Sequence, residues 1–214
     1  MATVRRPKPR ATYHHGDLRA ALVDAGLALA REGGPQAVVL REATRRVGVA
    51  PNAAYRHFAG HQALFEAVRA AALGALARAI EAELRLAEAL PDPAERARGM
   101  LAAVGRGYLD FAQAETGWFL TAFAAGAFDV ELPPDPARTA DKGLNPFELL
   151  GYALDAMVQA GALPADRRPG AEFLAWSSVH GLALLIIDGP LRRAPPAARA
   201  ELGARLLRMV EDGL

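Results

Sequence analysis

Apolar residues recur at spacings of three and four along most of the chain, and this period constrains the fold more than any other feature. Leu18, Leu22, Ala25 and Leu29 form one such stripe, which is the apolar face expected of an amphipathic helix. Runs of strand length in which apolar and polar residues alternate are missing. Because 52% of the residues are hydrophobic, the chain can bury a sizeable core. The sequence therefore predicts an all-α protein.

Glycine and proline positions indicate where the predicted helices end. Gly33 and Gly34 end the first helix, Gly48 separates two short helices, and the Pro-Asp-Pro sequence at 91–93 closes a long one. The predicted helices span residues 17–31, 40–47, 51–58, 61–90, 94–114, 118–128, 147–161, 171–188 and 197–210. The proline-rich segment 131–145 is the one long loop, and we expect it to be the most mobile part.

Charge divides the chain into a basic and an acidic part. We expect a basic N-terminal arm at 1–12, a three-helix head at 13–60 and a helical body at 61–214. Residues 1–61 contain ten Lys or Arg and four Asp or Glu, a net charge of +6, whereas the whole chain carries +1, which leaves −5 for the remainder. A basic head on an acidic body is typical of a protein that binds a polyanion and has a separate second task.

Several classes of protein are disfavoured by what the sequence lacks. The chain has no cysteine, which excludes disulfides, thiol nucleophiles and thiolate metal sites. Polar residues follow the basic N-terminus, where a signal peptide would have an apolar stretch. The longest apolar stretch, 173–187, is interrupted by Ser177, Ser178 and His180 and is shorter than the roughly 20 residues that span a bilayer. We therefore expect a cytoplasmic protein without a membrane partner.

The most informative stretch, residues 40–58, combines two short helices with a tight turn. Gly48 allows the positive φ that a sharp corner needs, and Pro51 suits the first turn of the second helix. Apolar residues at the inner positions are expected to anchor the pair on the first helix of the head: Ala43, Val47, Val49, Ala54 and Phe58. The second helix leaves an outer surface that fits a major groove. The sequence thus predicts a helix-turn-helix unit.

Residues 13–68 resemble the DNA-binding head of TetR-type regulators. The matching motifs are Tyr-His-His-Gly-Asp-Leu-Arg (13–19), Ala-Arg-Glu-Gly-Gly-Pro (30–35), Leu-Arg-Glu (40–42), Gly-Val-Ala-Pro (48–51), Ala-Tyr-Arg-His-Phe (54–58) and Ala-Leu (63–64). In the body, Trp-Ser-Ser-Val-His-Gly (176–181) resembles the Trp-His-Gly signature of one ligand-binding subgroup. The chain is therefore identified as a member of the TetR family with a WHG-type C-terminal ligand-binding domain.

The resemblance implies that the outer residues of the head bind DNA. Tyr55 and His57 would bind backbone phosphates, whereas Asn52 and Arg56 would lie at base edges. Asn and Arg are chemically suited to that role because they form paired hydrogen bonds with adenine and guanine. The predicted DNA-binding residues are Arg41, Arg45, Pro51, Asn52, Ala53, Tyr55, Arg56, His57 and His61.

Four positions depart from the family pattern. Thr44 and Val47 stand where small alanines are usual, Ala50 replaces the usual serine cap, and His61 replaces a lysine that contacts phosphate. Together these departures are expected to weaken DNA affinity or to make it depend on pH. They leave the assignment of the head unchanged.

Aromatic residues concentrate between residues 100 and 128, and two interpretations of them stay open. They are either ordinary core or, in part, the lining of the effector cavity that the resemblance implies. Trp176 and His180, four apart on one helix face, are likewise either a buried pair or neighbours of the pocket or dimer interface. The predicted ligand-binding residues are Tyr108, Phe111, Trp118, Phe119, Phe123, Phe147, Tyr152, Met157, Trp176 and His180. We expect a hydrophobic or flat small molecule, oriented by Arg106 or Asp110 and gated by the loop 131–145.

The last two predicted helices are candidates for self-association. The segment 171–188 is apolar on nearly all sides, which the core of one subunit alone would hardly require. A homodimer is expected, as the resemblance also implies, and the predicted interface residues are Phe173, Leu184, Ile187, Leu202, Leu206 and Met209. The predicted function is a ligand-responsive repressor without a cofactor, released from a palindromic double-stranded DNA operator by a small hydrophobic effector. The alternative is an architectural DNA-binding protein without a ligand sensor.

Metal binding and catalysis find little support in the sequence. His57 and His61 have a spacing that suits metal ligands, but Gly60 lies between them in a predicted corner, and no acid or cysteine completes a site. Ser177 and Ser178 lack the Gly-x-Ser-x-Gly elbow of a nucleophilic serine, and no phosphate-binding glycine loop is present. The sequence therefore predicts neither a metal site nor an enzyme.

Overall fold

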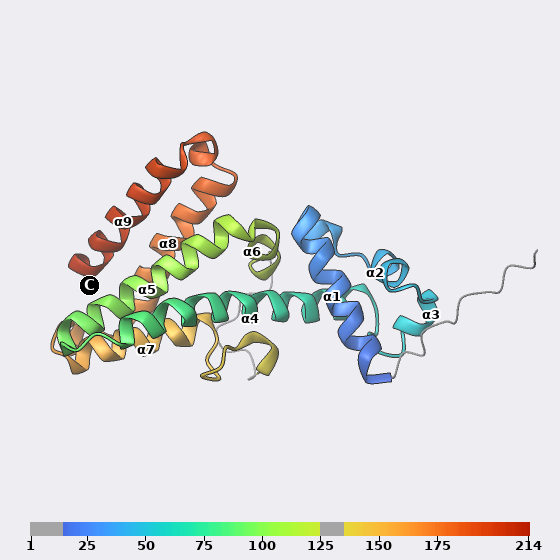
Figure 1. The fold of residues 1–214 in the computed structure, drawn as a ribbon, viewed down its shortest axis with the longest axis horizontal. Coiled ribbons are helices and arrows are strands. Elements are labelled where there is room, and N and C mark those ends of the chain that lie inside the picture. Colours follow the sequence, from blue (N-terminus) through green and yellow to red (C-terminus); the bar gives the residue numbers. More distant parts are fainter. Residues whose placement is uncertain (1–14, 125–134) are drawn as a thin grey trace, which may run out of the picture.

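The computed structural model describes residues 15–124 and 135–214 (Figure 1), so the arm at 1–12 lies outside the described residues. These ranges contain helices and no strand, as the sequence predicts. The α-helices are α1 (His15–Gly33), α2 (Leu40–Val47), α3 (Pro51–Ala54), α4 (His61–Glu88), α5 (Pro93–Ala114), α6 (Thr116–Ala122), α7 (Pro146–Gln159), α8 (Ala171–Ile187) and α9 (Pro196–Gly213). Short 3-10 turns are η1 (Pro35–Ala37), η2 (Pro136–Arg138), η3 (Ala165–Arg167) and η4 (Pro190–Arg193). Within the described ranges, no helix is long and apolar enough to cross a membrane.

The head, formed by α1, α2, α3 and the first turns of α4, lies at one end of an elongated molecule (Figure 1). Leu22 of α1 and Leu64 and Val68 of α4 are fully buried in its core, and Phe58 after α3 closes it at 3% exposure. Helices as short as α2 and α3 are marginal in isolation, so their packing on α1 and α4 is what holds them in place.

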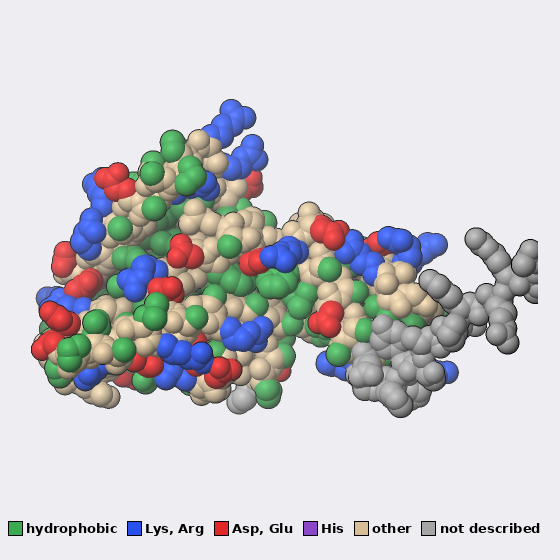
Figure 2. Space-filling model, viewed as in Figure 1, with side chains coloured by type: hydrophobic (Ala, Val, Ile, Leu, Met, Phe, Trp, Pro, Cys, Tyr) green, Lys and Arg blue, Asp and Glu red, His purple; other side chains and the backbone are tan. Residues whose placement is uncertain are grey.

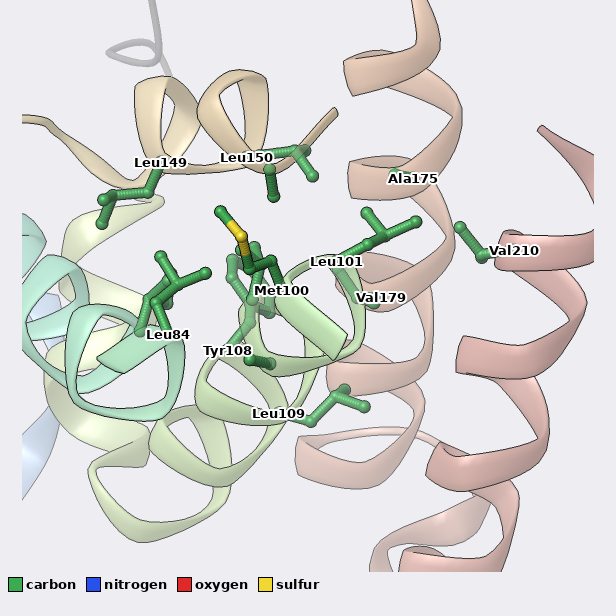
Figure 3. Close-up of a cluster of buried hydrophobic side chains, with 14 of the residues drawn as sticks. Leu84, Met100, Leu101, Tyr108, Leu109, Leu149, Leu150, Ala175, Val179 and Val210 are labelled. Carbon is green, nitrogen blue, oxygen red and sulfur yellow. The ribbon is translucent and has the colours of Figure 1, made fainter. Parts of the chain in front are cut away.

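The body consists of the rest of α4 with α5 to α9 (Figure 1). Its core is aliphatic and aromatic and is built from six helices, α4 to α9. Leu84 of α4, Met100 and Tyr108 of α5, and Leu149 and Leu150 of α7 gather in one cluster (Figure 3). The side of this cluster that faces α8 and α9 contains the cavity described below.

Helix α4 belongs to both cores and joins the head to the body. Its first turns bury Leu64 and Val68 in the head, whereas Ile80 and Leu84 are fully buried in the body. Gly107 lets α5 approach α4 closely, because a Cβ atom at this position would lie 2.8 Å from the Cα atom of Ile80. The packing therefore continues along α4 from the head into the body, across the boundary that the sequence predicts at residue 60.

Two predicted helices are shorter in the structure. The second helix of the helix-turn-helix was expected at 51–58, but α3 ends at Ala54. Phe58 must reach the head core, so the chain turns inward after α3, and the N–H groups of His57 and Phe58 both donate to the Ala54 carbonyl, each at 2.9 Å. The helix expected at 118–128 is α6, which begins at Thr116 and ends at Ala122, and residues 125–128 lie outside the described residues.

The described part of the segment 131–145 is folded against α4. The backbone N–H of Lys142 donates to the buried Glu81 carboxylate at 3.2 Å, and Asp141 pairs with Arg85 at 2.5 Å. Asn145 then begins α7 with a capping box. Residues 135–145 thus contact α4, residues 131–134 lie outside the described residues, and the expected gate stays a prediction.

Candidate functional site

The turn between α2 and α3 is fixed by Gly48. This glycine takes a left-handed conformation (φ 76°), and its N–H bonds the Arg45 carbonyl at 3.2 Å. A side chain would be strained in that conformation. Thr44, one of the departures from the family pattern, is 1% exposed, and its hydroxyl donates to the Arg41 carbonyl at 2.8 Å. The extra polar group is thus satisfied within α2, and the corner has helix-turn-helix geometry.

The outer side of the head presents the predicted DNA-binding residues together. Exposed residues of this set are Arg41, Arg45, Pro51, Asn52, Tyr55, Arg56 and His61, while Ala53 and His57 are partly buried. Tyr55 is a large aromatic residue with 57% of its surface exposed, and Lys and Arg side chains gather over α2 (Figure 2). Ala50 has the extended backbone of an N-cap residue, but its methyl group accepts no hydrogen bond from α3.

Ion pairs within the head occupy some of its arginines. The Arg45 guanidinium donates to both Glu42 oxygens, at 2.9 and 2.6 Å, and this hydrogen bonding lowers the pKa of the Glu42 carboxyl. Arg46 is held in the same way by Glu32. Among the described residues, Arg41 and Arg56 form no ion pair.

A mostly apolar cavity lies in the body between α5, α7, α8 and α9. Its volume of about 40 Å³ suffices for a few water molecules but not for a drug-sized ligand. Four predicted residues line it: Tyr108, Phe123, Phe147 and Trp176. The other lining residues are mainly aliphatic, and three of them, Leu101, Val179 and Val210, approach one another from α5, α8 and α9 (Figure 3).

A chain of hydrogen bonds gives this apolar region its polar atoms. The Trp176 indole can only donate, so at 3.1 Å it donates to the Tyr108 hydroxyl oxygen. The hydroxyl hydrogen is then available to the Nδ1 atom of His180 at 2.7 Å, which must be unprotonated to accept it. Burial raises the pKa of Tyr108 and lowers the pKa of His180, so both are neutral near neutral pH. Phe119, fully buried, packs edge-on against the Tyr108 ring.

Other predicted ligand contacts lie away from the cavity. Met157 is 1% exposed within the core, and Tyr152 lies on the surface, where its hydroxyl donates to Glu88 at 3.0 Å. Arg106 and Asp110, which were expected to orient the ligand, line a different hollow and not the cavity. The aliphatic lining was missed because the prediction followed aromatic residues, although the apolar period of α5 already indicated which of its faces is internal. Helix α8 is apolar on nearly all sides and gave no such signal.

Two predicted ligand contacts belong to the junction of body and head. The Trp118 indole, on α6, donates to the Leu27 carbonyl of α1 at 2.7 Å, and Phe111 packs against its ring. Arg31 of α1 lies over the same indole, 5.3 Å from the ring centroid, and pairs with Glu115. Helix α6 therefore connects the cavity end of the body to the head.

The predicted interface residues lie on an apolar surface of α8 and α9. Phe173 is 52% exposed, Leu184 is 41% exposed and Met209 is 60% exposed, while Ile187, Leu202 and Leu206 are partly buried. Leu174 and Leu185 extend the same exposed set on α8.

A helix-turn-helix head joined to a helical body with an apolar cavity defines a DNA-binding regulator with a ligand-sensing domain. Residues 22–68 match the model of bacterial regulatory proteins of the tetR family, and residues 101–210 match that of the tetracyclin repressor-like C-terminal domain. The chain belongs to the tetR family, whose members are ligand-responsive DNA-binding transcriptional regulators.

Solved structures share the fold of this chain. A protein of unknown function from Rhodococcus sp. RHA1 is 26% identical with a TM-score of 0.72, and the match covers 96% of this chain and 99% of that one. RolR in complex with resorcinol is 18% identical with a TM-score of 0.57, covering 91% and 88%. A structure assigned to the tetR family from Shewanella sp. PV-4 is also 18% identical, with a TM-score of 0.57, covering 89% and 95%. No curated protein sequence matches significantly.

Proposed function

We propose that the chain is a repressor that binds a palindromic operator as a homodimer and leaves it when a small hydrophobic effector enters the body cavity. The observation that supports this most is the position of α6. Phe123, directly after this helix, lines the cavity, and Trp118 within it bonds the α1 backbone at Leu27. A ligand that enlarges the cavity therefore acts on an element that touches the head.

In this proposal, the exposed residues of the helix-turn-helix bind the operator. Asn52 and Arg56 read base edges, and Tyr55 and His57 bind phosphates. Arg41 and Arg56 have no ion pair within the described residues, so neither must give up an internal partner on binding DNA. Arg45 must exchange Glu42 for phosphate, which makes its contribution smaller.

The operator surface is tested by binding after the preferred sequence has been selected from a random DNA pool. Arg56→Ala is expected to weaken the selected operator by about 1–3 kcal/mol and to relax the sequence preference. Arg193→Ala, which removes an exposed arginine of the body, is the matched control and should change little. Unchanged operator affinity in Arg56→Ala would contradict the assignment of the head.

The homodimer forms, in this proposal, through α8 and α9. Met209 is 60% exposed, so Met209→Glu places a charge in the interface without disturbing the core of the subunit. Sedimentation is expected to show a dimer for the natural chain and a monomer for this variant. Leu86→Glu is the control, since Leu86 on α4 is 69% exposed and outside the predicted interface. A dimer that persists in Met209→Glu would contradict this interface.

The cavity favours a small, flat and largely apolar effector. Its wall is aromatic and aliphatic, and the Tyr108 hydroxyl is one place where a ligand can form a hydrogen bond. The bound resorcinol of RolR is a small flat aromatic of this kind. The cavity is too small for such a ligand as it stands, so binding must select a more open state of the body, and this difference in affinity is what regulates DNA binding.

A further inference from the structure

A second hollow lies on the outside of the body, between α5, α8 and α9. Its volume is about 330 Å³, which is larger than the volume of the cavity. Its floor is apolar, with Leu109, Ile186 and Leu207, whereas charged side chains form its borders. Figure 2 shows this arrangement as an apolar recess between α5 and α9 with Arg, Asp and Glu side chains on both sides. We refer to this hollow as the α5–α9 groove.

The α5–α9 groove and the cavity share a thin wall. Leu207 of α9 and Ala102 of α5 line both spaces. Leu207 packs on Gly105, and a Cβ atom at Gly105 would lie 2.1 Å from the Leu207 Cδ2 atom. Gly105 has no side chain and Leu207 is only partly buried, so the Leu207 side chain is the part of this wall that can move by changing its rotamer.

Some of the charged side chains that border the α5–α9 groove form ion pairs and others do not. Arg106 pairs with Glu83 at 3.3 Å, and Glu211 pairs with Arg98 at 2.8 Å. Arg199 and Arg208 form no ion pair among the described residues. The Nε atom of Arg199 is buried and has no hydrogen-bond acceptor.

An acid on the opposite border does not cancel these two cations. Asp110 stands on α5, and among the described residues its carboxylate forms no ion pair with Arg199 or Arg208. The α9 side of the groove therefore keeps an excess of positive charge. An anionic group bound there would give the Arg199 guanidinium the acceptor that it lacks.

We propose that the α5–α9 groove and the cavity form one effector site for a small amphiphilic carboxylic acid. The carboxylate binds Arg199 and Arg208, and the apolar part passes Leu207 into the cavity. This inference rests on the proposed function and names its ligand class. By the helix period, Leu202, Leu206 and Met209 lie on another side of α9, so the proposed dimer leaves the groove open.

Calorimetric titration with matched acids and alcohols tests this proposal. The probes are phenylacetate, phenylpropionate, phenylbutyrate and phenylvalerate, each compared with the alcohol of the same chain length. The natural chain is expected to bind the best acid at least about tenfold more tightly than its alcohol, as charge-assisted hydrogen bonds to arginine imply. The double variant Arg199→Gln with Arg208→Gln should lose this preference and keep its affinity for the alcohol.

Control variants separate the groove from general charge effects. Arg205→Gln removes an exposed arginine of α9 that does not line the groove, and it should keep the acid preference. Leu207→Ala should speed the association of acids and alcohols alike, because it removes the wall between groove and cavity.

The outcomes distinguish this proposal from the proposed function. Equal affinity for acids and alcohols, an acid preference that survives the double variant, or binding of no acid at all would overturn the groove proposal. Saturable binding of alcohols alone, with Trp176 fluorescence changing, would leave the body cavity as the effector site. If neither acids nor alcohols bind, the result would count against both the groove proposal and the proposed function.

Discussion

His180 links the cavity to the pH of the solution. The Nδ1 atom of its imidazole accepts a hydrogen bond from the Tyr108 hydroxyl, and burial lowers the pKa of His180 below the ordinary value. In the unfolded chain the pKa returns to about 6.5, so the unfolded state binds the proton more readily than the folded state. The stability that neutral His180 provides is therefore complete above about pH 6.5 and is lost as the pH falls toward the lower folded value.

This direction of the pKa shift predicts how stability depends on pH. The free energy of unfolding in urea should be lower at about pH 5.5 than at about pH 7.5. His180→Gln removes the titrating group and should flatten this difference, although it lowers stability at both pH values. An identical pH dependence in the natural chain and in His180→Gln would show that other groups control it.

Glu42 competes with DNA for Arg45. The two side chains are joined by hydrogen bonds of 2.9 and 2.6 Å, and the lowered pKa keeps Glu42 charged. Glu42→Gln should therefore release Arg45 to a phosphate, raise operator affinity, and steepen the salt dependence of log K by about 0.9 for each added phosphate contact. Glu83→Gln, which breaks a comparable pair in the body, is the control. An unchanged salt slope in Glu42→Gln would mean that Arg45 does not reach the backbone.

At the scale of elements, the close packing of α6 against α1 depends on Gly117. A Cβ atom there would lie 2.1 Å from the Ala30 carbonyl oxygen, and backbone cannot yield as a flexible side chain can. Gly117→Ala should therefore cost about 1–3 kcal/mol of unfolding free energy. Gly151→Ala is the control, because the nearest atom to the new Cβ atom would lie at 3.5 Å, an ordinary contact distance. The higher helix propensity of alanine should leave this variant as stable as the natural chain or more stable by up to about 1 kcal/mol. Equal stability of the two variants would contradict this tight packing.

Helix positions followed from the sequence wherever a clear apolar period met a glycine or proline stop. The helix expected at 171–188 is α8, Ala171–Ile187, and the one expected at 40–47 is α2, Leu40–Val47. The prediction failed at α3, because propensity does not show that Phe58 must turn back into the head core. Proline and glycine at 135–145 indicated a loop, but they did not show that Asp141 pairs with Arg85 or that the Lys142 backbone N–H donates to Glu81 of α4.

The candidate sites were predicted unequally for a related reason. The exposed head residues are close in sequence, so one motif locates them together. The cavity collects residues from distant helices, and the period of a helix shows that a face is internal but not which neighbour it meets. Trp118 illustrates this limit, since it was expected at the ligand and instead bonds Leu27, 91 residues earlier in the chain.

At the scale of the whole molecule, two cores share one long helix and one junction. Helix α4 enters both cores, and α6 touches α1 while its end lines the cavity. A change in the body can therefore reach the head along two routes without unfolding either part. An effector that controls DNA binding must bind the free and the operator-bound protein with different affinities, since equal affinities do not shift the equilibrium between these two states.

The most direct test is the reciprocity of the two binding events. Using the phenylalkanoate or phenylalkanol with the highest affinity, the dissociation constant of the compound is measured with the free protein and with the operator complex. The account predicts weaker binding to the complex, and weakening of operator binding by saturating compound by the same factor. Equal affinity of the compound for the free protein and for the operator complex would contradict the central claim that this cavity controls the head.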